Sequence, residues 1–421
     1  MELYSWVDEV INLSQAATDP NTLLNLLTLS SGRSIFDLAS FTRQSKHLPN
    51  LRFSISSTLG MAQEHTATNM WYDFLSNHLL YLANRLRGSD PRSTFDTFNQ
   101  GFAYFTKVYK LLPEGRWSAP LIKWFCCELY TLAKAADRES ESSGKKTVCF
   151  NEAVRSIQQL FAICQSSSQD FPDSKLYCVM YCINMLFKIF FNLDMIQSCQ
   201  TLVKWYEQNQ SKIVFEEYPM SVQATFKYFA GRMALYQMEI VKAEENLQFV
   251  FMHCHKKSFK NRRLAIRYLT PAKMLLGTYP SEELLKKYQL KEYIEISRAV
   301  RTGNLKKFNE ELAKYEELYI SKGVYLVMDK LRAVTYRNLF KKVVKILLPT
   351  GGPLKLEEFN KSVQWMLSDP MDPLETECIL ANMIHQGFLR AYISHEKQMV
   401  VMSKKNDIFP AVRSIYPSSA K

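Results

Sequence analysis

Glycine and proline are scarce in this 421-residue chain, which has 13 Gly and 15 Pro. These two residues supply most tight turns, so a sheet-rich fold that needs a turn after every short strand is disfavoured. Hydrophobic residues make up 47% of the sequence and aromatic residues 13%, which is ample for a packed interior. The composition therefore predicts a mainly helical protein, whose length suits two or three domains or an extended helical repeat.

The sequence displays neither a leader peptide nor a clear membrane span. Residues 1–8 have no basic segment and no continuous apolar run, so no secretory signal is expected. The most apolar stretch, residues 177–193, contains Asn184, Lys188 and Asn192, which favours a buried helix over a membrane helix. Nine cysteines, an odd number, are expected to be reduced thiols in the cytosol or nucleus.

Motifs for catalysis are also missing. The chain has no Gly-rich phosphate-binding loop, no G-x-S-x-G and no H-E-x-x-H. Paired acids such as Glu282 and Glu283 stand near lysines, as on a solvated helix face. His253, Cys254 and His255 are consecutive, and neighbouring side chains on a helix point about 100° apart. The three side chains therefore do not converge on one metal ion. We therefore expect no enzymatic activity, no metal and no cofactor.

Positive charge is concentrated in one part of the chain. Residues 251–421 contain 30 Lys and Arg against 17 Asp and Glu, whereas residues 1–250 contain 23 against 24. The densest run is free of acidic residues and holds Lys256, Lys257, Lys260, Arg262, Arg263, Arg267 and Lys273. We interpret it as a contact surface for RNA, DNA or an acidic protein, with Phe259 and Tyr268 placed to stack on bases. The alternative is a solvated helix face.

Helical periodicity dominates the rest of the sequence. Apolar residues recur at helical spacing in 121–132 and 154–161, between polar breaks at 87–94, 139–147 and 165–174. From 175 to 334, amphipathic segments follow one another closely, and 228–251 resembles a tetratricopeptide pair with small Gly231 and Ala243 at close crossings. We expect an N-terminal helical region over 1–174 and a tetratricopeptide-like helical-repeat solenoid over 175–334.

A different module is predicted over residues 335–410, followed by a tail over 411–421. A first helix ends at the turn 349–353, a second has inward apolar residues over 356–366, and a third begins at Asp372-Pro373 and closes near Gly387. Two β-prone runs, 390–394 and 399–403, then form a hairpin. Three helices and a hairpin make a winged helix. The predicted fold class is therefore all-α, a helical solenoid capped by a C-terminal winged helix.

The charges of this winged helix argue against sequence-specific DNA reading. Its third helix, over residues 373–389, has no Lys or Arg to reach base edges or neutralise phosphates. The cations lie instead on the first helix and around the hairpin, at Arg337, Lys341, Lys342, Lys345, Arg390, Lys397, Lys404 and Lys405. Such placement suits contact with a nucleic-acid backbone or protein docking. Ordinary solubilising lysines are an equal alternative.

These segments resemble PCI domains, the scaffold modules of the proteasome lid, the signalosome and translation initiation factor three. The resemblance spans about residues 174–410. It is carried by KYFAGR at 227–232, KAEENLQFVF at 242–251, HCHKKSFKNRRLAIRYLTPAKMLLG at 253–277, RAVRTGNL at 298–305, YRNLFKKV at 336–343 and ECILANMIHQGFLRAYISHEKQMVVMS at 377–403. Within the family, the chain is similar to the branch linked to nuclear-pore transcription and mRNA export, and to its sister, signalosome subunit twelve.

The resemblance implies a non-enzymatic scaffold in the nucleus, at the nuclear pore and partly cytoplasmic. It implies pairing with a second PCI protein through winged helices, and we place Tyr392, Met399 and Val401 of the hairpin at that contact. It also implies a small acidic disordered partner shared with the proteasome lid, low-specificity binding of RNA or DNA backbones, and no membrane contact. The open alternative is a signalosome-associated subunit in regulated protein degradation, without a nucleic-acid role.

Overall fold

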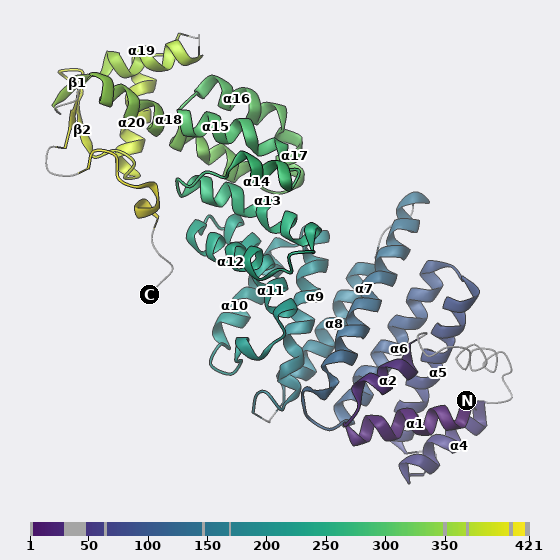
Figure 1. Ribbon diagram of the computed structural model, residues 1–421. Helices are drawn as coiled ribbons and strands as arrows, with labels where there is room; N and C mark the ends of the chain where they lie inside the picture. Colours follow the sequence, from purple (N-terminus) through teal and green to yellow (C-terminus); the bar gives the residue numbers. More distant parts are fainter. Residues whose placement is uncertain are drawn as a thin grey trace. The chain divides into compact units, whose positions relative to one another are not determined.

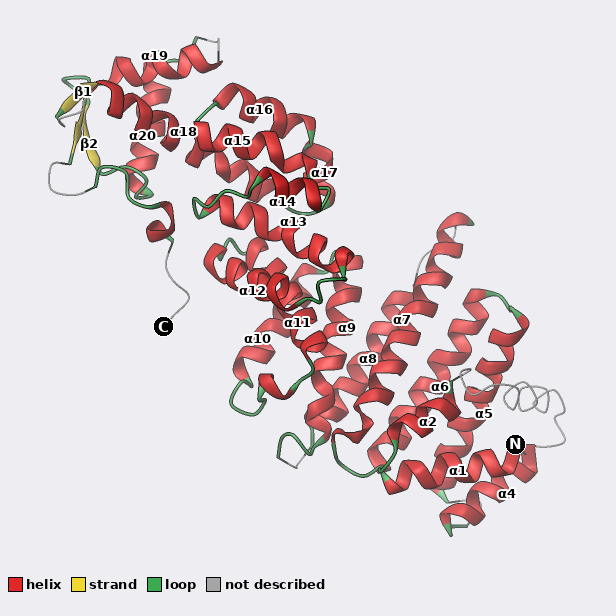
Figure 2. Ribbon diagram, viewed as in Figure 1, coloured by secondary structure: helices red, strands yellow, loops and turns green. Residues whose placement is uncertain are grey.

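The computed structural model describes residues 3–28, 48–62, 65–144, 148–167, 170–347, 352–367, 370–403 and 407–416. Helices account for most of them, and strands occur only near the C-terminal end of the described residues (Figure 1; Figure 2). The chain divides into two compact units, residues 1–226 and 227–421, with the boundary inside α11 (Met220–Tyr236). The mainly helical fold predicted from the composition is confirmed.

The first unit is a succession of helices in which sequence neighbours pack on each other. It contains α1 (Leu3–Ala16), α2 (Pro20–Leu27), α4 (Leu48–Leu59), α5 (Thr66–Arg87), α6 (Pro91–Leu111), α7 (Ala119–Ser142), α8 (Cys149–Gln165), α9 (Val179–Asn192) and α10 (Ile196–Gln208). The break between α5 and α6 follows from local signals. Gly88 takes a left-handed conformation and ends α5. Pro91 is the first residue of α6, and the side chain of Asp90 caps this helix by accepting a hydrogen bond from the Ser93 N–H.

The core of the first unit is rich in aromatic residues. The rings of Phe74 and Phe125 pack against Phe105, with centroids 5.5 Å and 4.1 Å away. Helix α9, which the sequence predicts as a buried helix, has most of its apolar side chains in this interior. Across the described parts of the chain, none of the helices combines the length and the apolar character that a membrane crossing requires.

The second unit begins with a helical-repeat part. Its helices are α12 (Ile240–His253), α13 (Phe259–Leu275), α14 (Glu282–Lys287), α15 (Ile294–Thr302), α16 (Leu305–Lys314), α17 (Glu316–Ser321) and α18 (Tyr325–Leu347). The expected close crossing is present between α11 and α12. A Cβ on Gly231 would lie 2.7 Å from the Leu247 side chain, and Ala243 is fully buried. Small residues at these positions therefore let the two helices approach.

The winged helix follows on the same unit. Helix α18 is continuous across residues 334 and 335, and then come β1 (Pro353–Lys355), α19 (Leu356–Leu367), α20 (Pro373–His385), β2 (Ala391–Ser394) and β3 (Met399–Met402). The Asp372 side chain caps α20 by accepting from the Leu374 N–H, as predicted. The hairpin is also confirmed, and β1 adds a third strand, giving an antiparallel sheet of order β1-β3-β2.

Candidate nucleic-acid and partner interface

The basic turn, which we define as Lys256, Lys257 and Lys260, covers the connection between α12 and α13 and the first turn of α13. All three side chains are exposed, and none has a hydrogen-bond or ion-pair partner among the described residues. The side chain of Ser258, which precedes α13, caps no N–H, so the positive end of the helix dipole adds to the local charge. The turn therefore offers three unneutralised ammonium groups to an anionic partner.

The next two cations of the predicted run are engaged within the unit. The guanidinium of Arg262 lies 4.4 Å from the centroid of the Phe251 ring, a cation–π contact. Arg263 donates from Nη2 to the main-chain oxygen of Gln289 at 3.1 Å. Both side chains are half-buried. They contribute positive charge beside the basic turn, but their positions are set by contacts with α12 and with the turn that follows α14.

The last two cations of the run are paired with acids. Arg267 lies 3.8 Å from the largely buried carboxylate of Glu292, and Lys273 lies 3.8 Å from Glu244. Acidic residues are absent from this run of sequence, yet tertiary packing supplies them from elsewhere in the unit. The seven cations therefore do not form one free surface. The lysines of the basic turn are available, whereas Arg267 and Lys273 are neutralised within the fold.

The two aromatic residues of the run differ in accessibility. Phe259 is 38% exposed, and its ring stacks on that of Tyr288 with centroids 5.4 Å apart and planes at 20°. Tyr268 is buried, with the guanidinium of Arg232 lying 4.7 Å from its ring centroid. The expectation that Tyr268 can stack on a base is therefore wrong, because its ring is packed inside the helical repeat. The ring of Phe259 is accessible, and its stacking on a base stays a prediction.

The cations of α18 also separate into two kinds. Lys341 and Lys345 are exposed and make no side-chain contact with a charged or polar group among the described residues. Lys342 is exposed but donates to the main-chain oxygen of Thr302 at 2.6 Å. Arg337 is only 6% exposed, because it is buried under the segment 409–410. Arg337 therefore does not present a cation to phosphate, which corrects its assignment to the nucleic-acid surface.

The third helix of the winged module, α20, presents an uncharged surface over most of its length. Its exposed side chains after the first turn are Cys378, Ala381, Asn382 and His385. On the hairpin and just before it, Lys397 and Arg390 are exposed without side-chain partners among the described residues. Lys404 and Lys405 lie outside the described residues. Because α20 itself has no Lys or Arg, its charge pattern is unsuited to reading bases in a major groove.

The outer sheet face is the second candidate surface, and it comprises Pro353, Lys355, Tyr392, Ser394, Met399 and Val401. Val401 of the central strand is paired with Pro353 on one side and Tyr392 on the other, and Met399 with Lys355 and Ser394. Directly opposed residues share a face of the sheet. Leu354, Val400 and Met402 on the opposite face are buried, so this face is turned toward solvent.

The residues expected at a protein contact are thus brought together. Tyr392 is 63% exposed, and Met399 and Val401 are half-buried on the same face. Pro353 and Lys355 were not predicted, because a three-residue strand that starts with proline shows no alternating pattern. A strand this short leaves no periodic signal in the sequence.

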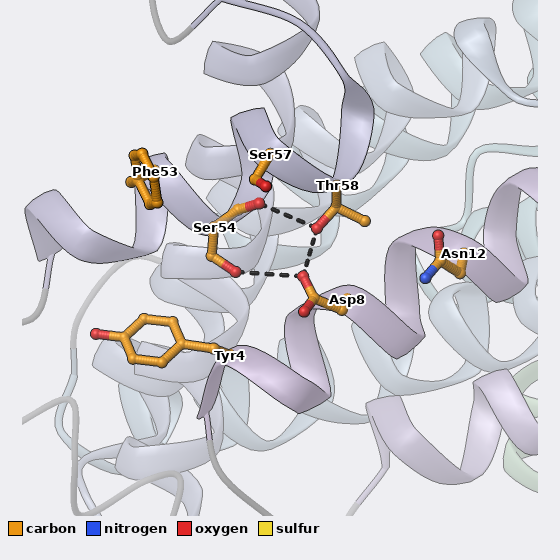
Figure 3. A pocket seen from close by; sticks show the side chains of 7 residues that line it. All are labelled: Tyr4, Asp8, Asn12, Phe53, Ser54, Ser57 and Thr58. Carbon is orange, nitrogen blue, oxygen red and sulfur yellow. Dashed lines mark hydrogen bonds between the residues drawn. The ribbon is translucent and has the colours of Figure 1, made fainter.

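A pocket of about 700 Å³ lies between α1 and α4 in the first unit (Figure 3). Asp8 is at its centre and accepts hydrogen bonds from the hydroxyl groups of Ser54, at 3.2 Å, and of Thr58. These bonds tie α4 to α1. Tyr4 and the exposed ring of Phe53 line the rim. Among the described residues that line the pocket, Asp8 has no second carboxylate, histidine or cysteine beside it, so these residues do not form the paired groups of acid–base catalysis.

Six of the nine cysteines are buried, whereas Cys127 and Cys378 are exposed. Burial raises the pKa of Cys178 to about 12, and hydrogen bonds with Cys126 and Cys164 hold the pKa of Cys182 well above its usual value. These thiols stay protonated and pack as small apolar groups, as the sequence predicts. The ring of His253 donates to a main-chain oxygen of α12. Within the described ranges, no three His, Cys, Asp or Glu side chains are placed to hold a metal ion.

A family model described as "PCI domain" matches residues 312–404 of this chain. The matched segment runs from the end of α16 through the winged helix and its hairpin. It therefore includes every residue of the outer sheet face and the cations of α18.

Curated relatives match over most of their length. PCI domain-containing protein 2 of Xenopus laevis is 35% identical over 389 residues, which cover 90% of this chain and 93% of the relative. The protein of the same name from Danio rerio is 37% identical, over 74% of this chain and 77% of the relative. A "Protein CSN12 homolog" from Mycosarcoma maydis is 29% identical, over 82% of this chain and 85% of the relative.

Proposed function

The chain belongs to the PCI-domain family, and we propose that it is a non-enzymatic scaffold subunit of a nuclear complex. It pairs with a second PCI protein and a small acidic protein. The assembly forms a nucleic-acid-binding platform in mRNA export and transcription-coupled mRNP biogenesis. On this proposal the protein works in the nucleus, at the nuclear pore, and partly in the cytoplasm.

The observation that carries the proposal is the outer sheet face. Four of its six residues, Pro353, Tyr392, Met399 and Val401, are apolar or aromatic, and the face is turned to solvent. Exposed aromatic and aliphatic side chains grouped on one rigid element are typical of the centre of a protein interface. PCI domains usually assemble with other PCI proteins, so a second PCI protein is the partner we assign to this face.

Charge supports the second part of the proposal. The basic turn and the exposed Lys341 and Lys345 supply cations that no acid of the described residues neutralises. Such groups attract a phosphate backbone without reading its sequence, and the same charges attract an acidic, disordered protein. The cation-free α20 is consistent with a platform that binds nucleic acid with low specificity.

Affinity purification of the tagged full-length chain from cells tests the pairing. Replacing Tyr392 and Val401 together with Glu (Tyr392→Glu, Val401→Glu) places two charges in the outer sheet face, and we expect the second PCI protein to be lost from the purified complex. Ala381→Glu together with Asn382→Glu is the matched control, because it adds two charges to the exposed surface of α20 instead. Retention of the second PCI protein by the double variant would place the interface elsewhere and reject this part of the proposal.

The alternative function is that of a signalosome-associated PCI subunit in regulated protein degradation, with no nucleic-acid role. The match to a relative named "Protein CSN12 homolog" favours it. The same purification separates the two functions, because export factors and signalosome subunits are different proteins. Recovery of signalosome subunits without export factors, together with no RNA in the eluate, would support the alternative and overturn the first proposal.

A further inference from the structure

We infer that Phe259 is a stacking platform for an unpaired base, and that the basic turn therefore binds single-stranded nucleic acid. This inference rests on the proposed nucleic-acid role, and it adds the strand type and the residue that recognises it. The observation behind this inference is an exposed aromatic ring that is held in place by a second ring. Unneutralised lysines lie two residues before it and one residue after it in the sequence.

The ring of Phe259 is backed by a fixed aromatic cluster. It stacks on Tyr288, which is only 4% exposed, and Tyr288 is in turn held by the edge of Phe251 at a centroid distance of 6.0 Å. The guanidinium of Arg262 lies on Phe251. Because Tyr288 covers one side of the Phe259 ring, its 38% exposed surface lies away from Tyr288. The ring is therefore oriented before any ligand arrives, which lowers the entropy cost of stacking.

Cations surround this ring at short range along the chain. Lys257 and Lys260 are two residues before and one residue after Phe259, and Lys256 is adjacent to Lys257. Lys287 approaches from α14, with its Nζ 5.9 Å from the Tyr288 ring centroid. A strand whose base lies on Phe259 would thus have its phosphates beside lysines. Aromatic stacking with a basic track is the usual arrangement for binding single strands without sequence preference.

Stacking on Phe259 selects against a duplex. In a double helix the faces of the bases are covered by neighbouring bases, so they reach a protein ring only after unstacking, which has a free-energy cost. A duplex can use the lysines alone. An acidic peptide can also use the lysines, but it has no flat base to lie on Phe259. The exposed ring therefore favours a single-stranded nucleic acid over both of these ligands.

The test removes the Phe259 ring from the protein and the bases from the nucleic-acid strand, each with and without the other. The full-length chain, with any subunits that stay bound, is titrated with a 12-nucleotide oligouridylate and with an abasic ribose-phosphate strand of the same length and charge. We expect the wild type to prefer oligouridylate about tenfold. Phe259→Ala should weaken oligouridylate binding about tenfold and leave abasic binding unchanged, whereas Phe259→Trp should keep the preference. Leu264→Ala, which removes another exposed apolar side chain from α13, is the matched control and should change neither affinity.

Each other outcome has a definite meaning. Equal loss for the two strands in Phe259→Ala would show a structural role for the ring and overturn the inference. Loss of binding on replacing Lys256, Lys257 and Lys260 with Glu, with no effect of Phe259→Ala, would overturn stacking but leave the proposed nucleic-acid role intact. If the wild type binds neither strand but binds a poly-glutamate peptide through the same lysines, both the inference and the nucleic-acid role are wrong.

Discussion

Arg337 and Pro410 are joined by a hydrogen bond, in which the guanidinium Nη2 donates to the main-chain oxygen at 2.6 Å. The same nitrogen lies 3.1 Å from the oxygen of Phe409, and the guanidinium is 5.8 Å from the centroid of that residue's ring. These contacts tie the middle of α18 to the chain that follows the hairpin. The buried side chain of Arg337 therefore anchors residues 409–410, which follow the winged helix, to α18.

We expect Arg337→Ala to destabilise the second unit by about 2–4 kcal/mol, because it leaves buried carbonyl oxygens without a donor. The matched control is Lys341→Ala, which lies one turn further along α18 and removes an exposed cation without a partner. Urea unfolding followed by the hydrogen exchange of peptides from residues 227–421 measures the difference in the second unit. Equal midpoints for the two variants would show that the bonds of Arg337 contribute nothing net to stability.

Gly303 gives a second stability prediction. It has φ +69°, and a Cβ at this position would lie 2.4 Å from the main-chain nitrogen of Leu339. Gly303→Ala should therefore lower the free energy of unfolding by about 3 kcal/mol, since it adds a backbone clash to the left-handed conformation. Gly387→Ala is the control, with φ +81° but its nearest neighbour 3.8 Å away at Ile415. It should cost about 1 kcal/mol. Similar losses would show that α15 and α18 separate easily.

Local signals in the sequence were sufficient for the third helix and the hairpin of the winged helix. The Asp372-Pro373 pair marks the start of α20, and the β-prone runs around residues 395–398 mark the hairpin. Strand β1 was not predicted, because it has three residues and gains its stability from pairing with β3 rather than from its own sequence. An alternating pattern of apolar residues reveals a strand only when several of its side chains are buried. Strand β1 buries only one of its three side chains, so the pattern does not reveal it.

The candidate site was predicted less completely, because tertiary contacts between residues distant in the sequence decide which cations are free. The spacing of Arg337, Lys341 and Lys345 places them on one helix face, yet the acceptors that bury Arg337 are more than 70 residues away in the chain. Arg267 pairs with Glu292 in the same manner. A charge run therefore locates a basic region, whereas the fold decides which of its cations remain free.

His78 gives the first unit a predictable response to pH. It is fully enclosed, and burial lowers its pKa from 6.5 to about 4. Between pH 6.5 and 4 the unfolded chain takes up a proton that the folded chain does not, so stability present above pH 6.5 is lost as the pH falls. At pH 5 the loss from this group is about 2 kcal/mol.

The comparison of wild type with His78→Gln isolates this contribution. The amide keeps a donor for the main-chain oxygen of Leu27, which His78 contacts at 2.8 Å, but it does not titrate. Five of the six tryptophans lie in residues 1–226, so tryptophan fluorescence during urea unfolding at pH 7 and pH 5 reports mainly on this unit. The variant should lose less stability on acidification. An unchanged pH difference would mean that His78 titrates normally in the folded state.

Neutralising the basic turn should change how binding depends on salt. Each lysine that contacts a phosphate of a single strand releases about 0.7 of a counterion, so replacing Lys256, Lys257 and Lys260 with Gln should reduce the slope of log K against log salt by about 2. Arg262 and Arg263 are left in place, because they hold Phe251 and the main chain at Gln289. The control replaces three exposed lysines of the first unit with Gln, at Lys110, Lys123 and Lys204, and so makes the same change in net charge. If both triple variants reduce the slope equally, the attraction comes from the charge of the whole protein, and the basic turn is not a binding site.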